Sequence, residues 1–135
     1  MADQLTLEIV TPERLVLSQS VDEVILPSVE GYMGVRPGHA ALLAQLDVGQ
    51  VSYRVGSEEK LVAVSGGFAE VLQTGVSILA ETAEPAEEID LDRAQRARED
   101  ARMQLESGLS EHESSVAQLR LKRAVSRIRV RGQIR

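Results

Sequence analysis

The sequence lacks cysteine and tryptophan, and its 135 residues include only one phenylalanine and two tyrosines. Without cysteine the chain has neither disulfides nor thiolate metal sites, so we expect a reducing compartment. The scarcity of aromatic residues nearly excludes the stacking platforms that bind single-stranded nucleic acids. The core must therefore be built from valine, leucine, isoleucine and alanine.

Long apolar runs are also missing. The longest unbroken run is the five residues 40–44, and the first ten residues contain an acid and no base. These features predict neither a signal peptide nor a membrane span. The length predicts one domain, or one domain with a small appendage.

Charge divides the chain into two different parts. Residues 1–88 contain fourteen acidic and four basic residues, net −10, whereas residues 89–135 contain seven acidic and eleven basic residues, net +4. This asymmetry predicts an acidic body and a basic tail that has an acidic partner.

The acidic part shows the pattern of short β-strands. Leu5, Leu7 and Ile9 alternate with other residues at a period of two, and similar runs occupy residues 15–17, 21–26, 49–55, 61–64, 68–72 and 76–80. Residues 56–59 are predicted to form a hairpin turn. Nine or ten strands with a turn signal every 8 to 12 residues favour a β-sandwich or a flattened barrel.

The stretch from residue 23 to residue 49 is the most constrained part of the chain. Pro27 is expected to end a strand because it cannot donate a ladder hydrogen bond. Gly31 and Gly34 flank Tyr32 and Met33, and residues 37–38 predict a second turn. Tyr32, Met33 and Val35 are expected to be presented near a turn. Fixed, partly apolar loops of this kind are often contact surfaces.

The basic part changes to a helical period. Residues 81–86 are predicted to be a linker, and Asp90 is placed to cap a helix that runs to Ser107. A second helix is expected from about Glu111, after the break at Gly108 and Ser110. The predicted apolar stripes of the two helices are narrow and rich in alanine: Ala94, Ala97, Ala101 and Leu105, and then Ala117, Leu121, Ala124 and Ile128. Such a hairpin buries little area and is expected to be marginal alone and able to open.

Three segments together resemble a known family. They are GYMGVRPGHAALLAQLDVG at 31–49, VSGGFAEVL at 64–72 and IDLDRA at 89–94, and with the alanine-rich tail they resemble the epsilon subunit of bacterial F-type ATP synthase over essentially the whole chain. The resemblance implies a ten-stranded β-sandwich over residues 1–86, which binds the central stalk and the c-ring, and a regulatory helical hairpin over residues 87–135.

The same resemblance implies a non-catalytic rotor subunit. It would couple the catalytic sector to the c-ring in proton-driven ATP synthesis and inhibit ATP hydrolysis through its C-terminal helices. The implied partners are the gamma subunit, the c-ring and, in the inhibitory state, the beta and alpha subunits. The implied location is peripheral, at the cytoplasmic face of the bacterial inner membrane.

The family's c-ring contact region corresponds here to Glu30, Gly31, Tyr32, Arg36, Gly38 and His39. The alternative is that these are ordinary exposed turn residues. His39 has no cysteine and no second histidine nearby, so a turn histidine bonded to backbone is favoured over a catalytic or metal role. No catalytic and no metal-binding residues are predicted.

The basic tail carries the regulatory expectation. After Glu113 the chain has no acid, and the resemblance implies that an inhibitory basic face meets an acidic segment of a beta subunit through Arg120, Lys122, Arg123, Arg127, Arg129 and Arg131. A solvated helix face is the alternative. Two states are expected: a hairpin folded on the sandwich, which permits hydrolysis, and an extended one, which inhibits it.

The segment IDLDRA also matches a pattern that helps some relatives to bind ATP. The implied residues are Ile89, Asp90, Arg93 and Ala94, with Arg123 and Arg127 as phosphate ligands on the second helix. Asp90 as a plain N-cap and Arg93 as a surface charge remain the alternative. No cofactor is expected to be required, and ATP is a possible regulatory ligand.

Two other classes of function are disfavoured. The acids are scattered, and no Ser-His-Asp set, phosphate-cradling glycine loop or metal-ligand spacing supports an enzyme. A basic-tailed interaction or nucleic-acid-binding module is the alternative function, but the acidic body would repel a phosphate backbone.

Overall fold

The computed structural model describes residues 3–134 and divides after Pro85 into two compact units. The first unit holds ten strands: β1 (Leu5–Val10), β2 (Leu15–Val21), β3 (Glu23–Ser28), β4 (Gly31–Val35), β5 (Leu42–Gln45), β6 (Gly49–Val55), β7 (Glu58–Ser65), β8 (Phe68–Leu72), β9 (Gly75–Leu79) and β10 (Thr82–Pro85). The second unit holds a 3₁₀ turn, η1 (Ala86–Glu88), and the helices α1 (Leu91–Glu106) and α2 (Glu111–Gly132).

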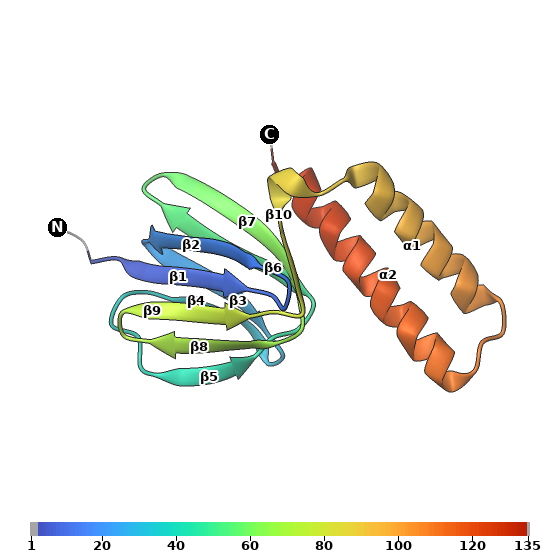
Figure 1. Cartoon of the computed structure of the whole chain (residues 1–135), viewed down its shortest axis with the longest axis horizontal. Helices are drawn as coiled ribbons and strands as arrows, with labels where there is room; N and C mark the ends of the chain where they lie inside the picture. Colours follow the sequence, from blue (N-terminus) through green and yellow to red (C-terminus); the bar gives the residue numbers. More distant parts are fainter. Residues whose placement is uncertain (1–2, 135) are drawn as a thin grey trace. The chain divides into compact units, whose positions relative to one another are not determined.

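The strands form two five-stranded sheets, in the orders β2-β1-β9-β8-β5 and β10-β7-β6-β3-β4 (Figure 1). We call these sheet A and sheet B. Neighbouring strands are antiparallel except for β1 and β9, which are parallel. The predicted fold class, an all-β sandwich followed by a two-helix hairpin, is confirmed.

The core of the sandwich is aliphatic, as the composition requires. Leu5, Leu7 and Ile9 on β1 are at most 1% exposed, and the alternating residues of β1 face outward. Both sheets contribute to one buried cluster, which includes Val24 and Leu26 from sheet B. The alternation of residues in the sequence therefore predicted correctly which side chains of β1 face the core.

Two strand predictions in the central stretch were wrong. Pro27 does not end its strand, because β3 runs on to Ser28. Its pairing with β6 stops at Ile25, so Pro27 has a Cα partner only on the β4 side, Tyr32, and a proline is tolerated there. Val35, expected to be presented near a turn, is the last residue of β4 and is fully buried, whereas Tyr32 is exposed beside the β3–β4 turn, as expected.

Two further predicted connections are partly strand. Residues 82–85, expected as linker, form β10 and pair with β7 at the edge of sheet B. An edge strand needs hydrogen bonds on one side only, so Pro85 does not prevent the pairing. Glu58 and Glu59, expected in the hairpin turn, are the first residues of β7 and pair with β6.

Gly67 shows why one glycine of the 64–72 segment is needed. Its φ is +98°, and a Cβ added there would lie 1.9 Å from the carbonyl oxygen of Leu79. The backbone of the bend before β8 thus packs directly on the end of β9, which no other residue allows.

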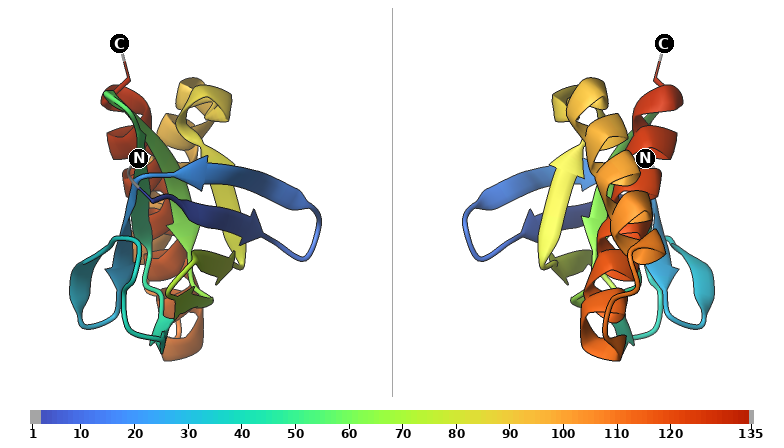
Figure 2. Two further views of the ribbon diagram at one scale, coloured as in Figure 1. Left: turned by 90° about the vertical axis from the view of Figure 1, so that its left-hand side faces the viewer. Right: turned by 90° about the vertical axis from the view of Figure 1, so that its right-hand side faces the viewer.

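The second unit is an antiparallel helical hairpin (Figures 1 and 2). Asp90 is the N-cap of α1, with its Oδ1 accepting from the backbone N–H of Arg93 at 3.1 Å, and Ser110 caps α2 in the same way. The helix–helix seam is built from buried alanines at steps of seven: Ala94 and Ala101, and Ala117 and Ala124. Ala97, expected on the same stripe, is exposed, because a seven-residue step makes a narrower seam than a three-and-four pattern. Within residues 3–134, no helix combines the length and apolarity that a membrane span requires.

Candidate functional site

The six residues of the expected c-ring contact region do not form one loop. Glu30 and Gly31 lie at the β3–β4 turn, whereas Arg36, Gly38 and His39 follow the opposite end of β4. Five strand residues separate the two groups by roughly 17 Å at about 3.4 Å per residue. Strand β4 therefore presents two separate ends, with Tyr32 close to the first.

A chain of ion pairs holds the Arg36 end. Arg36 Nε lies 3.4 Å from the Glu23 carboxylate, and Arg54 lies 3.5 Å from Glu23 and 3.6 Å from Asp22. The backbone N–H of Gly56 donates to Asp22 at 2.7 Å, and this bond, assisted by Gln4 and Arg54, lowers the pKa of Asp22 below its usual value of 3.8. The loop after β4 is thereby tied to the β2–β3 corner and the β6–β7 turn.

His39 takes the structural role that was favoured for it. Its Nδ1 lies 2.7 Å from the carbonyl oxygen of Ala40, and its backbone N–H donates to the carbonyl of Arg36 at 3.1 Å. Bonding to backbone is the interpretation that the sequence favoured. Among residues 3–134, no three histidine, cysteine or acidic side chains are grouped so that they could hold a metal ion.

The other end of β4 combines a tight turn with an exposed aromatic ring. The Ser28 hydroxyl accepts from the backbone N–H of Glu30 at 3.3 Å and donates to the carbonyl of Gly31, which closes the turn. Tyr32 is 61% exposed, yet its hydroxyl oxygen accepts the backbone N–H of Gln50 at 3.3 Å. This end is open to a partner while its backbone is fixed.

A second surface was missed by the sequence analysis. Across the outer face of sheet A, four apolar side chains stand in line on neighbouring strands, and we call them the apolar row: Leu15, Val10, Leu79 and Phe68. Strand spacing gives the row a length of about 14 Å. Leu15, Leu79 and Phe68 are 56%, 62% and 50% exposed. The line beside it is polar: Ser18, Glu8, Ser77 and Glu70.

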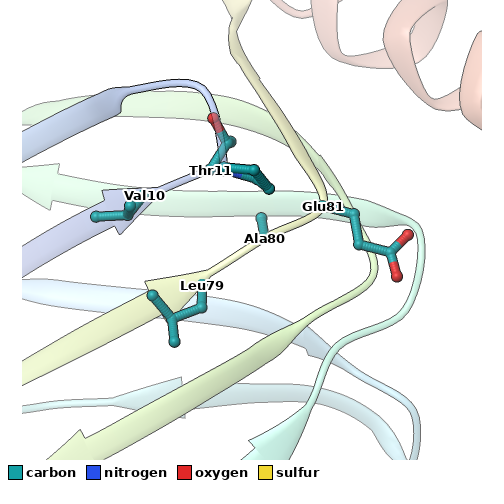
Figure 3. Close-up of a pocket in the computed structure, with 6 residues that line it drawn as sticks. Val10, Thr11, Leu79, Ala80 and Glu81 are labelled. Atoms are coloured by element: carbon teal, nitrogen blue, oxygen red, sulfur yellow. The ribbon is translucent and has the colours of Figure 1, made fainter.

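A shallow pocket adjoins the middle of the row. Val10 and Leu79 line it together with Thr11, Pro12, Ala80 and Glu81. Figure 3 shows Val10 and Leu79 at the ends of their strands and the Glu81 carboxylate directed away from them. The row could have been suspected from Phe68 and Leu79, which are apolar at outward positions, but the parallel pairing of β1 with β9 is not visible in the sequence.

The six basic residues of the tail do not share one helix face. At 3.6 residues per turn, one side of α2 carries Arg120, Arg123, Arg127 and Arg131, and Lys122 and Arg129 lie on the opposite side. Arg120, Lys122 and Arg129 are exposed, whereas Arg123, Arg127 and Arg131 are half-buried. The prediction of a single basic face is therefore wrong. Helix α2 has two basic faces, and the larger one carries four arginines.

The candidate ATP ligands are brought to one end of the hairpin. Because α1 and α2 are antiparallel and joined by residues 107–110, the start of α1 lies at the same end of the hairpin as the last ten residues of α2, which include Arg123 and Arg127. Ile89 and Ala94 are buried, and Arg93 is exposed. One carboxylate oxygen of Asp90 serves as the N-cap, so the capping role is present.

The family comparisons match both units in order. Residues 4–86 match the model described as ATP synthase, Delta/Epsilon chain, beta-sandwich domain, and residues 87–132 match the model for the long alpha-helix domain of the same chain. The chain belongs to the ATP synthase delta/epsilon family. It is 48% identical over 130 residues to the ATP synthase epsilon chain of Syntrophobacter fumaroxidans, covering 96% of this chain and 97% of the relative.

Other relatives agree with this assignment. The epsilon chain of Nitratidesulfovibrio vulgaris strain DP4 is 46% identical over 132 residues, which cover 98% of each chain. A chain in the cryo-EM structure of the Euglena gracilis mitochondrial ATP synthase, OSCP/F1/c-ring, matches with a TM-score of 0.78 and 30% identity over 88% of this chain and 76% of that one. A chain of the Tetrahymena thermophila central stalk/c-ring structure shares the fold, with a TM-score of 0.61 at 14% identity and coverage of 97% and 99%.

Proposed function

We propose that this chain is the epsilon subunit of a bacterial F-type ATP synthase, a non-catalytic component of its central stalk and rotor. The observation that carries the proposal is the unbroken match to the sandwich and long-helix models of the family over residues 4–132. The two structural units divide at the boundary between these models within one residue. The subunit would be peripheral, held at the cytoplasmic face of the membrane through the complex.

The sandwich serves as the anchor, and the apolar row is the surface that docks on the gamma subunit. An exposed line of leucine, valine and phenylalanine beside a pocket is the kind of patch that partners cover. Its apolar centre and polar neighbouring line have the layout of a protein interface, with a core and a rim. Burial of these side chains would fix the sandwich to the stalk.

The Tyr32 end of β4 faces the c-ring. The two ends differ, because Arg36 is engaged by Glu23 whereas Tyr32 and Glu30 are exposed on a fixed turn. A partner can meet Tyr32 without breaking an ion pair. Arg36, Gly38 and His39 then support the loop rather than make the contact.

The hairpin acts as the brake on ATP hydrolysis. The buried residues of its two helices are four alanines and Val130, so little apolar area is lost when the helices separate. Once extended, the arginines of α2 would meet an acidic segment of a beta subunit, with alpha nearby. Folded and extended hairpins are then two states of one switch.

The test compares full-length chain with a chain truncated after Ala86 in membranes that carry the rest of the complex. We expect both to recover the gamma subunit in a pull-down and the truncated form to hydrolyse ATP faster. Equal hydrolysis rates with intact assembly would contradict the inhibitory role of the hairpin. Failure of both forms to recover the gamma subunit would contradict the role of the sandwich as the anchor.

Point variants locate the anchor. Leu79→Ser should reduce gamma recovery without changing the melting temperature, because Leu79 is 62% exposed. Leu72→Ser is the matched control: it is an exposed leucine on the same face, at the opposite end of β8 from Phe68. Equal recovery with both variants would place the gamma contact elsewhere.

ATP binding to the folded hairpin is the second candidate function. The observation that favours it is the antiparallel pairing, which brings Ile89, Asp90, Arg93 and Ala94, at the start of α1, to the same end of the hairpin as the last ten residues of α2, which include Arg123 and Arg127. Arginine forks suit phosphate oxygens, and bound ATP would stabilise the folded hairpin and relieve inhibition. Hydrogen exchange of α1 and α2 with and without millimolar ATP tests this, since unchanged protection would contradict it.

A further inference from the structure

Gly49 occupies a position where a side chain would force its neighbours to move. A Cβ added to Gly49 would lie 2.8 Å from the hydroxyl oxygen of Tyr32 and 2.8 Å from the Cβ of Pro27. Gly49 is not one of the glycines with positive φ, so its backbone conformation does not call for glycine. The missing side chain therefore makes room for two neighbours, and one of them is the exposed aromatic ring.

Tyr32 is consequently held from several sides. Its backbone is paired with that of Pro27 across β3 and β4, its hydroxyl accepts the N–H of Gln50 at 3.3 Å, and the ring reaches over Gly49 at the start of β6. A surface tyrosine normally samples several rotamers, and this freedom is lost when a partner binds. Here the hydrogen bond and the close approach to Gly49 favour one ring orientation in the free chain.

The platform beneath the ring is itself fixed by backbone bonds. The N–H of Asp47 donates to the carbonyl of Pro27 and the N–H of Val29 donates to the carbonyl of Gln45, each at 2.9 Å. These two bonds form an isolated antiparallel bridge between Ser28 and Leu46. The segment before β6 and the β3–β4 hairpin therefore behave as one body, with Gly49 at the point of closest approach.

We propose that Gly49 is a positioning residue that fixes Tyr32 in one orientation for the rotor contact. The inference rests on the proposed function, in which the Tyr32 end of β4 faces the c-ring. Gly49 itself is 9% exposed or less and need not touch the partner. It acts through Tyr32 by leaving the space in which the hydroxyl meets the Gln50 N–H.

The variants separate positioning from folding. Gly49→Ala removes the space, Tyr32→Phe keeps the ring and removes the hydroxyl, and Tyr32→Ala removes the ring. Gly34→Ala is the matched control on β4, because its Cβ would meet only Glu23 Oε1 at an ordinary 3.9 Å. NMR of each full-length variant reports ring contacts between Tyr32 and Pro27, and binding to a detergent-solubilised gamma and c-ring assembly reports affinity.

We expect Gly49→Ala and Tyr32→Phe to lose the fixed ring contacts and to weaken rotor binding about three- to tenfold, since ordering one side chain costs that much on binding. Gly34→Ala should match the wild type. In a Tyr32→Ala background, Gly49→Ala should have no further effect on affinity. If Gly49→Ala does not fold, Tyr32→Phe and Tyr32→Ala decide the question.

Three results would overturn the inference. Unchanged affinity of both Gly49→Ala and Tyr32→Phe would mean that orientation does not matter. An equal loss from Gly49→Ala with and without the Tyr32 ring would make Gly49 merely structural. If Tyr32→Ala binds like wild type, the c-ring contact fails and the positioning role with it, while the NMR contacts still report whether the free ring is fixed.

Discussion

Asp90 caps α1, and replacing it should open the hairpin by a predictable amount. Its Oδ1 caps α1 by accepting the Arg93 N–H at 3.1 Å. Replacing an N-cap aspartate by alanine costs about 1 kcal/mol. The seam that holds the helices together contains the buried methyl groups of Ala94, Ala101, Ala117 and Ala124, which contribute about 0.8 kcal/mol each, or roughly 3 kcal/mol together. The free energy lost with the cap is thus about a third of the free energy that these four methyl groups contribute.

A change of 1 kcal/mol raises the opening equilibrium about fivefold. We therefore expect amide hydrogen-exchange protection in α1 of the full-length chain to fall about fivefold in Asp90→Ala. Asp90→Ser and Asp90→Asn keep an N-cap acceptor and should stay within about twofold of the wild type.

Two outcomes would refute this reasoning. Unchanged protection in Asp90→Ala would show that the cap does not limit opening, and an equal loss in Asp90→Ser would show that the carboxylate matters for another reason. Repeating the measurement with ATP tests the proposed role of Asp90 in nucleotide binding. If ATP protects the wild type but not Asp90→Asn, whose cap is intact, the carboxylate itself takes part in nucleotide binding.

Three further changes test the sandwich and the seam. Asp22→Asn should lower the melting temperature near neutral pH, and because the folded-state pKa of Asp22 is below 3.8, this deficit should persist above that pH and vanish as the pH falls through the folded-state pKa. Gly67→Ala should destabilise the chain to urea by about 1–3 kcal/mol more than Gly56→Ala, since both need positive φ but only the Gly67 Cβ meets backbone. Ala124→Leu should destabilise the hairpin by about 1–3 kcal/mol, because the larger side chain overpacks the seam, and it should reduce amide protection in α2.

Each of these has a contrary result. A deficit of Asp22→Asn that grows below pH 3.8 would contradict the sign of the pKa shift. Equal urea midpoints for the two glycine variants would mean that the bend relaxes around the new methyl group. Unchanged amide protection in Ala124→Leu would mean that the space between the helices can accommodate the larger side chain.

Local patterns predicted most of the elements, and non-local pairing explains what they missed. The alternation of Leu5, Leu7 and Ile9 fixed the inward face of β1 because a strand has a period of two. Asp90 marked the start of α1, because capping is a local interaction, and the predicted break at Gly108 and Ser110 placed the start of α2. In contrast, β10 pairs with β7 across about twenty residues, and nothing in its own composition favours a strand.

The candidate surfaces show the same limit. The contact region was a continuous motif in the sequence, but a strand inside it carries Glu30 and Arg36 to opposite ends. The apolar row consists of side chains from four strands, and its order depends on the parallel pairing of β1 with β9. A surface assembled from distant segments has no sequence period that could reveal it.

The two units differ in how strongly their packing resists opening, and this difference suits an anchor that carries a brake. Burying a leucine, isoleucine or valine side chain contributes about 1.5–3 kcal/mol, and the sandwich core is built from such residues in both sheets. Each alanine of the hairpin seam contributes about 0.8 kcal/mol. A ligand or partner that supplies a few kcal/mol can therefore shift the hairpin between states without unfolding the sandwich. Because each seam alanine contributes so little, the free energy of opening the hairpin is small enough for such a ligand to change.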